Sequence, residues 1–299
     1  MMFDLTVTRR KDQARAMEKF SILIPTWNNL PYLRLCIESI RKNSRFKHQI
    51  IVHVNEGTDG TLQWLAEQAD IEYTYTPQNA GICYALNIGR TQVMTEYIVY
   101  MNDDMYVCPG WDEEFDREIK AIDHNLFFFS ATSIEPLASS NCVIEKDFGS
   151  EISSFQEKEL LEHFLDTVKA DWQGATWPPN IVHRNTWDMV GGYSTEFSPG
   201  MYSDPDFSMK LWHAGIRLFK GIGKSRVYHF GSKSTGRHVV KNRGYYTFIS
   251  KWGITSSTLT KNFLRRGEIF DGLLKEPANG SFTRIKNFFK RIGASVRND

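Results

Sequence analysis

Short runs of β-branched and aromatic residues alternate with longer amphipathic segments between Phe20 and Val107. The runs FSILIP, HQIIVHV, IEYTY and EYIVYM predict buried strands, and residues 30–41, 60–68 and 81–91 predict the helices between them. Leu33, Ile37 and Ile40 fall on one face of the first of these helices. This alternation is typical of βαβ units, so we expect an α/β fold with a mostly parallel central sheet.

The pattern becomes less regular after Trp111. FFFSATSI, CVIEKDF and PNIVHR are candidate strands, a polar helix is expected over 154–169, and residues 245–274 are expected to be helical. The sequence contains no repeats and no Pro/Gly/Ser-rich linker, which favours one continuous unit.

Composition narrows the class of protein. The 299 residues include 36 Lys plus Arg against 35 Asp plus Glu, a net charge of +1, so no nucleic-acid partner is expected. Four cysteines without a CxxC pair predict reduced thiols. The N-terminal residues do not resemble a leader peptide, and no apolar run approaches the roughly 20 residues that span a bilayer. We therefore expect a cytoplasmic protein, or one on the cytoplasmic face of the inner membrane.

Polar clusters follow three of the predicted strands, at residues 26–28, 55–57 and 102–104. Ligands of open α/β sheets bind beyond the carboxyl ends of the strands, so these clusters should converge. Asp103 and Asp104 would repel each other without a cation, and their hard oxygen ligands suit Mg²⁺ or Mn²⁺ together with a phosphate. The alternative is a turn that caps the following helix.

Five motifs in order resemble those of the family 2 glycosyltransferases over about residues 20 to 235: SILIPTWNN, VNEGTDGT, QNAGICYALNIG, NDD, and GGYSTEF followed by SDPDFSMKLWHAG. The resemblance implies a GT-A type Rossmann-like fold with a helical C-terminal extension. It also implies an inverting transfer of a sugar from a nucleoside-diphosphate sugar to an acceptor hydroxyl, with Mn²⁺ or Mg²⁺ as cofactor.

The resemblance assigns donor-side roles. Trp27 stands where the family stacks an aromatic on the nucleobase, although it could be a core residue. Asp104 would be the main metal ligand, His229 a further ligand or a structural histidine, and Asp103 a contact to the ribose or to the metal through water. Asp59 is expected to cap the helix that begins at Gly60. The donor-binding set is Pro25, Thr26, Trp27, Asn55, Glu56, Asn79, Gly81, Asn87, Asp103, Lys233 and Arg237.

On the acceptor side, Asp204 matches the family's general base, with Ser203 where an acid is more common. Alternatively, Ser203 or Asp204 caps a helix whose first position is Pro205. The residues expected to bind the acceptor are Trp177, Gly192 and Asp206. Trp177 belongs to an aromatic stretch, DWQGATWPPN, that either covers a sugar ring or packs in the core. Lys233 and Arg237 would close over the diphosphate, or lie in an ordinary solvated loop.

The expected organisation is an N-terminal lead-in (1–19), a GT-A catalytic domain (20–236), a helical extension (237–279) and a basic amphipathic tail (280–299). Within the catalytic domain, 20–110 would bind the nucleotide sugar and 111–236 the acceptor. The acceptor would be a saccharide or a lipid-linked molecule, in surface polysaccharide or lipopolysaccharide synthesis. Two alternatives are a nucleotidyltransferase, whose Gly-rich basic signature is missing, and a silent nucleotide-sugar-binding protein.

The tail concentrates positive charge. Residues 280–299 hold five basic residues and one acid, whereas the first 279 residues hold 31 basic and 34 acidic residues. Phe282, Ile285, Phe288, Phe289 and Ile292 recur at spacings of three and four, with Arg284, Lys286, Lys290, Arg291 and Arg297 near them. This pattern suits a helix on an anionic membrane surface, or a terminal helix packed on the protein or on another subunit.

Overall fold

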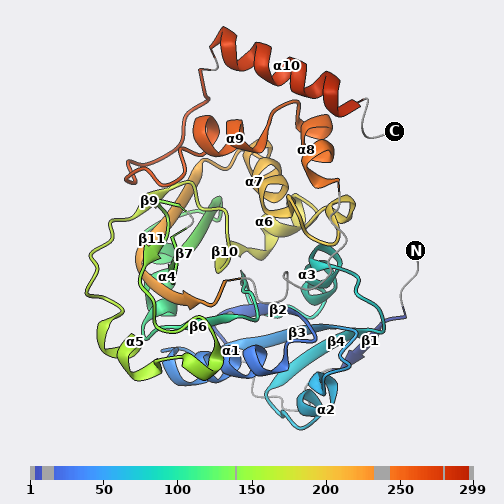
Figure 1. Ribbon diagram of the computed structural model, residues 1–299, viewed down its shortest axis with the longest axis vertical. Coiled ribbons are helices and arrows are strands. Elements are labelled where there is room, and N and C mark those ends of the chain that lie inside the picture. The colour runs from blue at the N-terminus through green and yellow to red at the C-terminus, as the bar shows by residue number, and fades with distance from the viewer. Residues whose placement is uncertain (1–3, 9–16, 139, 232–242, 279, 296–299) are drawn as a thin grey trace.

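A mixed sheet runs through the molecule, with helices on both of its faces (Figure 1). The computed structural model describes residues 4–8, 17–138, 140–231, 243–278 and 280–295. The strands are β1 Thr6–Thr8, β2 Ser21–Trp27, β3 Gln49–Asn55, β4 Ile71–Thr76, β5 Tyr97–Tyr100, β6 Met105–Val107, β7 Phe127–Glu135, β8 Ile144–Glu145, β9 Trp172–Gln173, β10 Asn180–His183 and β11 Leu218–His229.

The α-helices are α1 Leu30–Asn43, α2 Thr61–Ala66, α3 Ile82–Arg90, α4 Trp111–Lys120, α5 Glu157–His163, α6 Arg184–Met189, α7 Ser203–His213, α8 Gly244–Trp252, α9 Ser256–Thr258 and α10 Ser281–Ser295. Short 3₁₀ turns occupy Ile152–Ser154 and Thr195–Phe197, and a π-helical turn occupies Leu259–Phe263.

The sheet has the order β1-β4-β3-β2-β5-β10-β7-β11-β6, with β8 beside β7 and β9 beside β11. Strands β4, β3, β2 and β5 are parallel, and β10 is antiparallel to both of its neighbours. The expected α/β fold with a mostly parallel core is therefore confirmed. One apolar layer joins α1 and α4 to the sheet, and another joins α3, α6, α7 and α8 to it.

Several expected elements differ in length. The helix expected over 154–169 is only α5, because the chain beyond it carries exposed Leu165 and Val168 and offers no apolar face to bury. The strand expected in CVIEKDF shrinks to β8, which pairs with the end of β7. The N-terminal lead-in contributes a strand that was not expected, because Thr6–Thr8 pair with Tyr73–Tyr75 of β4.

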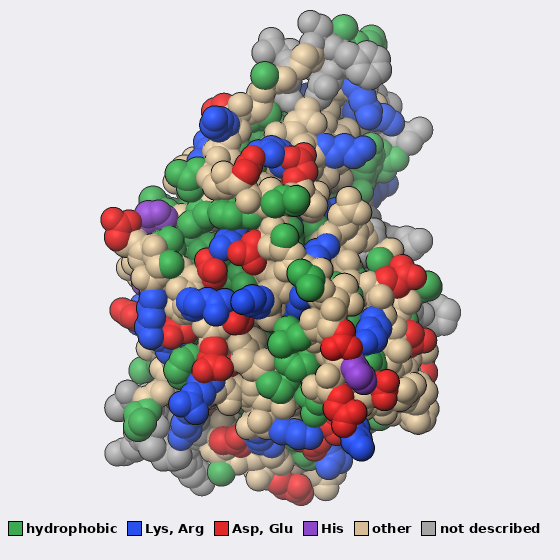
Figure 2. Space-filling model, turned by 90° about the vertical axis from the view of Figure 1, so that its left-hand side faces the viewer, with side chains coloured by type: hydrophobic (Ala, Val, Ile, Leu, Met, Phe, Trp, Pro, Cys, Tyr) green, Lys and Arg blue, Asp and Glu red, His purple; other side chains and the backbone are tan. Residues whose placement is uncertain are grey.

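The C-terminal region packs on the catalytic body through α8, with α10 beyond it at the end of the molecule (Figure 1). Gly253 ends α8 with a φ of +70°. The four cysteines are buried and free. No helix in the described ranges is long and apolar enough to cross a bilayer. On the face shown in Figure 2, acidic and basic side chains are interspersed, in keeping with the near-zero net charge.

Candidate active site

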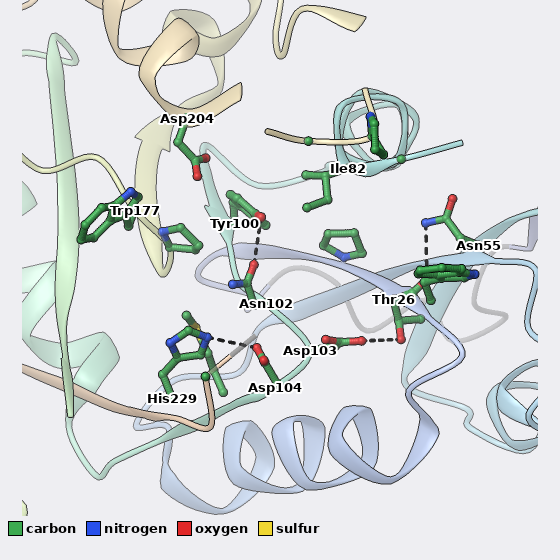
Figure 3. A pocket seen from close by; sticks show the side chains of 18 of the residues that line it. Thr26, Asn55, Ile82, Tyr100, Asn102, Asp103, Asp104, Trp177, Asp204 and His229 are labelled. Atoms are coloured by element: carbon green, nitrogen blue, oxygen red, sulfur yellow. Dashed lines mark hydrogen bonds and ion pairs between the residues drawn. The ribbon is translucent and has the colours of Figure 1, made fainter. Parts of the chain in front are cut away.

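A cleft of about 510 Å³ lies where the three polar clusters converge, beyond the ends of β2, β3 and β5 (Figure 3). It runs from a loop region around Thr26 and Asn55, past Asp103 and Asp104, to Asp204 and Trp177 on the other side. The lining residues are Pro25, Thr26, Trp27, Asn55, Asn79, Gly81, Ile82, Tyr100, Asn102, Asp103, Asp104, Met105, Ser133, Glu135, Trp177, Pro178, Pro199, Gly200, Met201, Asp204, His229 and Gly231. The expected convergence of the strand ends therefore holds.

Asp103 and Asp104 form the floor of the cleft. They follow β5 and are 3% and 2% exposed. The Thr26 hydroxyl donates a hydrogen bond to Asp103 Oδ2 at 2.6 Å. Thr26 reaches it because β2 runs parallel to β5, with Leu23 opposite Tyr100, and both strands end at the same edge. Because this acidic pair is buried and hydrogen-bonded at the cleft, it does not form an ordinary surface turn.

The imidazole of His229 faces Asp104, with Nε2 at 3.3 Å from Asp104 Oδ1. Strand pairing sets this contact, because His229 of β11 lies opposite Met105 of β6, the residue after Asp104. On its other side, His229 Nδ1 lies 2.9 Å from Glu135 Oε1, which is brought there by the parallel pairing of β11 with β7. Burial alone would lower the pKa of His229, but the two carboxylates outweigh it and raise the pKa to about 10.

These side chains fit a divalent cation. Asp104 offers a carboxylate oxygen, and His229 offers an imidazole nitrogen once a bound cation takes the place of its Nε2 proton. Glu135 orients the ring from behind. Carboxylate and imidazole donors together suit Mn²⁺, and a carboxylate that holds the other ring nitrogen is the usual second partner of a metal-bound histidine. Asp103 is held by Thr26, so Asp104 and His229 are the better placed ligands.

Asp204 points into the cleft from α7 (Figure 3). The alternative that Ser203 or Asp204 caps this helix is wrong. The helix begins at Ser203, the cap position is Tyr202 with a φ of +72°, and no side chain caps the end. The Asp204 carboxylate is therefore left for the cleft, where the Tyr193 hydroxyl donates to it at 3.2 Å. Burial raises the pKa of Asp204 to about 7, against the lowering effect of that hydrogen bond.

The far end of the cleft is built from the loops after β2 and β3. Asn55, the last residue of β3, joins the end of β2 to the segment between β4 and α3, since its Nδ2 donates to Thr26 O at 3.4 Å and its Oδ1 accepts from Ala80 N at 2.8 Å. Trp27 is partly exposed and lines the cleft, so it is not a core residue. Glu56 does not line the cleft, because its carboxylate accepts a hydrogen bond from Asn28 Nδ2 at 3.1 Å.

Asp59 supports this end from behind. Its Oδ1 accepts from Thr61 N at 3.2 Å, and its Oδ2 accepts from Leu30 N at 2.7 Å. The prediction that Asp59 caps this helix is wrong, because α2 begins at Thr61, its cap position is Gly60 and no side chain caps its end. The Asp59 carboxylate instead joins the start of α2 to the start of α1.

The two halves of the cleft are in direct contact at Gly81 and Pro199. Ile82 N donates to Pro199 O at 2.8 Å, and a Cβ on Gly81 would lie 2.6 Å from Pro199 Cα. Gly81 also has a φ of +81°, so a side chain there would be strained as well as crowded. On the wall beside Asp204, the Arg266 guanidinium lies 3.9 Å from the ring centre of Trp177 and supports it from outside the cleft lining.

Three expected site residues have structural roles instead. Asn87 clamps Tyr193, with its Nδ2 donating to Tyr193 O at 2.7 Å and its Oδ1 accepting from Tyr193 N at 2.9 Å. Gly192 leaves room for that clamp, because a Cβ there would lie 2.3 Å from Asn87 Oδ1. Asp206 is buried away from the cleft and pairs with Lys251 Nζ at 2.8 Å and Trp252 Nε1 at 2.9 Å. Of the aromatic stretch, Trp172 is buried in the core.

Lys233 and Arg237 lie outside the described residues. Three further residues of the cleft were not expected from the sequence: Tyr100, Asn102 and Glu135. The Tyr100 hydroxyl donates to Asn102 Oδ1 at 2.9 Å on the cleft floor, and Glu135 supports His229. Asn102 stood in the quoted NDD motif, whereas Tyr100 and Glu135 end strands with no local signal that they face a ligand.

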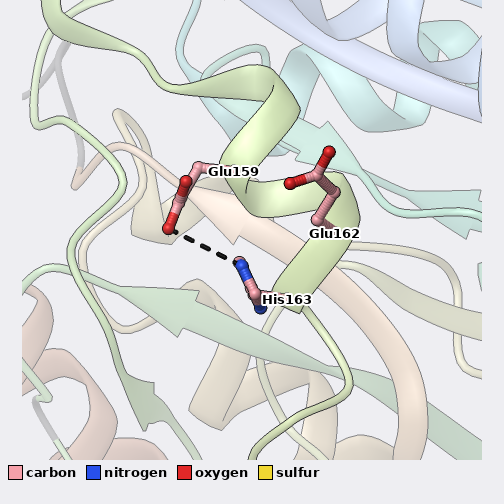
Figure 4. Close-up of side chains that lie close together, drawn as sticks. All are labelled: Glu159, Glu162 and His163. Atoms are coloured by element: carbon pink, nitrogen blue, oxygen red, sulfur yellow. Dashed lines mark ion pairs between the residues drawn. The ribbon is translucent and has the colours of Figure 1, made fainter.

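A second set of candidate metal ligands, Glu159, Glu162 and His163, lies on the surface of α5 (Figure 4). His163 is already engaged, with Nε2 at 3.7 Å from Glu159 and Nδ1 at 2.7 Å from Asp166. Glu162 lies 3.8 Å from Lys158. We interpret this set as helix-surface ion pairs, which carry little stability and indicate no metal site.

Comparisons with known proteins agree with the geometry. Residues 21–137 match the Glycosyl transferase family 2 model. The chain is 29% identical over 260 residues to the Bacillus subtilis glycosyltransferase YwdF, covering 82% of this chain and 88% of that protein. S. aureus TarS in complex with UDP shares the fold at a TM-score of 0.58 and 12% identity, over 93% of this chain and 72% of that one.

GalNAc-T7 with UDP, GalNAc and Mn²⁺ superposes at a TM-score of 0.55 and 12% identity, over 83% of this chain and 53% of that one. These matches confirm the expected family resemblance, the GT-A fold and the class of enzyme, and they argue against a nucleotidyltransferase.

The first prediction tests the metal site. Asp104→Asn should weaken Mn²⁺ binding by at least about tenfold, because it removes an anionic ligand and leaves the shape of the side chain. The melting temperature should change little, because Glu135 still balances His229. Mn²⁺ titration in the presence of a nucleoside diphosphate measures the effect. His163→Ala on α5 is the control and should bind Mn²⁺ normally; the reverse outcome would place the metal on α5.

The second prediction concerns the clamp. Asn87→Ala removes two hydrogen bonds to the Tyr193 backbone and should lower the free energy of unfolding by about 1–3 kcal/mol. Nucleoside-diphosphate affinity should be unchanged under conditions where the variant is folded. Urea denaturation and calorimetric titration measure the two quantities. A loss of affinity without a loss of stability would restore Asn87 as a donor-binding residue.

Proposed function

We propose that this glycosyltransferase, whose residues 21–137 belong to glycosyl transferase family 2, transfers a sugar from a UDP-sugar to an acceptor hydroxyl with inversion at the anomeric carbon. The observation that carries the proposal is the placement of Asp204 in the same cleft as Asp103, Asp104 and His229, but on another wall (Figure 3). One wall carries side chains that would hold a diphosphate through a divalent cation, and the other offers a base for the attacking hydroxyl.

In the reaction that we propose, Asp204 accepts the proton of the acceptor hydroxyl as its oxygen bonds to the anomeric carbon. The bond from that carbon to the diphosphate breaks at the same time, and the electron pair leaves with the UDP. The Tyr193 hydroxyl holds one oxygen of Asp204, so the other is free to take the proton. Attack from the side opposite to the leaving group explains the inversion.

The donor is proposed to be a UDP-sugar because TarS and GalNAc-T7 were both solved with UDP. Trp27 offers its indole face to the base, and Asn55 and Thr26 hold the loop beside it. Asp103, which Thr26 holds, faces the ribose side of the nucleotide in this arrangement. Pro25, Asn79 and Gly81 complete the donor wall.

Asp104 and His229 would hold Mn²⁺ or Mg²⁺ on the diphosphate side. Such an ion, when bound, offsets the negative charge that grows on the leaving UDP. Trp177 gives the acceptor side an aromatic face of the kind that packs on sugar rings, which supports a saccharide acceptor. The role in surface polysaccharide or lipopolysaccharide synthesis stays a prediction of the family resemblance.

The third prediction tests the base. Asp204→Asn preserves size and hydrogen bonding to Tyr193 but removes the proton acceptor, so turnover should fall by about 10² to 10⁴. UDP affinity should be retained. Asp188→Asn, an exposed partner of Arg90, is the control and should transfer sugar normally. Normal turnover by the Asp204 variant would eliminate this residue as the base.

The fourth prediction is a pH profile. Because the pKa of Asp204 is raised to about 7, kcat/KM should rise about tenfold per pH unit below that value and level off above it. The neighbouring groups Tyr193, Tyr100 and Cys83 have raised pKa values and stay neutral over this range. The rising limb should vanish from the residual activity of Asp204→Asn, and its persistence there would assign it to another group.

The same shift has a consequence for stability. The folded state binds the Asp204 proton more tightly than the unfolded chain does, because the pKa of this carboxyl group has its ordinary value of 3.8 in the unfolded chain. The resulting contribution to the free energy of unfolding is present below that value and is lost as the pH rises through about 7. Asp204→Asn should remove this part of the pH dependence in urea denaturation.

A further inference from the structure

Helix α10 turns its apolar side chains away from the protein. Ile285, Phe288, Phe289 and Ile292 are 54%, 60%, 66% and 49% exposed. Successive helical residues advance by about 100°, so positions 285, 288, 289 and 292 share one face. Large apolar side chains gathered on an exposed helix face are unusual in a soluble surface and mark a contact site.

The opposite face of α10 holds the helix to the protein. Asn287 and Ala294 are 5% and 1% exposed and lie about half a turn from the apolar face. Asn287 Oδ1 accepts from Thr258 Oγ1 at 3.0 Å and from Thr255 N at 3.4 Å. The helix is therefore anchored by a polar side chain and a small one. Its apolar face is not needed for that anchoring.

Basic residues flank the apolar face on both sides. Lys286 borders it on one side and Arg291 on the other, Lys290 lies further round the helix from Lys286, and all three are exposed. The segment 281–295 contains no Asp or Glu. Figure 2 shows hydrophobic and basic side chains close together at the upper end of the molecule, where α10 lies. The side chains of Phe282 and Arg284, and Arg297, fall outside the described part.

We propose that the outward face of α10 docks on an anionic lipid surface, with the four apolar side chains inserted among the acyl chains and the flanking Lys and Arg residues at the head groups. An interfacial helix requires this arrangement of an apolar face bordered by cations. Each basic residue near an anionic surface strengthens binding on the order of fivefold. The proposal does not depend on the chemistry assigned to the cleft.

A second copy of the chain fits the same face less well. Two α10 helices paired through their apolar faces would bring Lys286, Lys290 and Arg291 of each copy together, with no acid in either helix to balance them. Like charges at the edge of an interface oppose such pairing. An anionic lipid surface removes this repulsion.

The experiment measures co-sedimentation of the full chain with vesicles of phosphatidylcholine alone or with phosphatidylglycerol added. We expect binding to the anionic vesicles at low salt and little binding at 1 M salt, where the screening length is about 3 Å. Phe288→Ser with Phe289→Ser should weaken binding at least about tenfold, since these rings provide much of the inserted surface. Lys286→Gln, at the border of the apolar face, should weaken it about fivefold.

Val168→Ser with Leu137→Ser is the control, because both positions are exposed apolar residues far from α10 in the sequence and should leave binding unchanged. The substitutions on the outward face of α10 test the proposal more specifically than removal of residues 281–299, because removal would also expose Thr255 and Thr258 to solvent. Circular dichroism and thermal unfolding confirm that each variant is folded. Absence of wild-type binding, equal binding by the face variants, or a dimer that the Phe variant dissociates would overturn the proposal.

Discussion

Burial of two adjacent carboxyl groups is the constraint on which the cleft depends. Asp103 and Asp104 lose most of their contact with water just beyond the end of β5, and as neighbours in the chain their charges repel each other. Each has a partner from another strand, Thr26 from β2 for Asp103 and His229 from β11 for Asp104. These partners reach the acidic pair only if the strands hold their register, so the geometry of the cleft depends on the pairing of the sheet.

The opposite wall is positioned through contacts that are themselves outside the cleft. Asn87 of α3 grips the backbone of Tyr193, and Tyr193 in turn holds Asp204. The contact between Gly81 and Pro199 brings the same two halves together at the rim. A proton acceptor must stand at a fixed place relative to the leaving group, and these contacts join α3 to the wall that carries Asp204.

The C-terminal helix α10 is attached to the protein in a different way from the helices around the sheet. Helices α1 and α3 bury their apolar faces, whereas α10 is held by Asn287 and keeps its Phe and Ile residues outside. Asp206, buried on α7, binds Lys251 and Trp252 of α8, and α8 packs on α10. The helix that carries Asp204 is thus joined through α8 to the outward-facing surface, so attachment there would also orient the cleft.

The sequence by itself determined the α/β class, the strands β2 to β5 with their helices, and the meeting of three polar clusters, because periodicity is local and parallel strands end at one edge. Its family resemblance also pointed to Asp104, His229 and Asp204, which the structure brings into one cleft. Only the tertiary structure showed that Glu135 supports His229. It also showed that Asn87, Gly192 and Asp206 contact other parts of the protein and do not line the cleft. A residue of the same motif can face a ligand or a neighbouring helix. Strand register and helix packing decide between the two, and both depend on residues far apart in the sequence, so no local pattern encodes them.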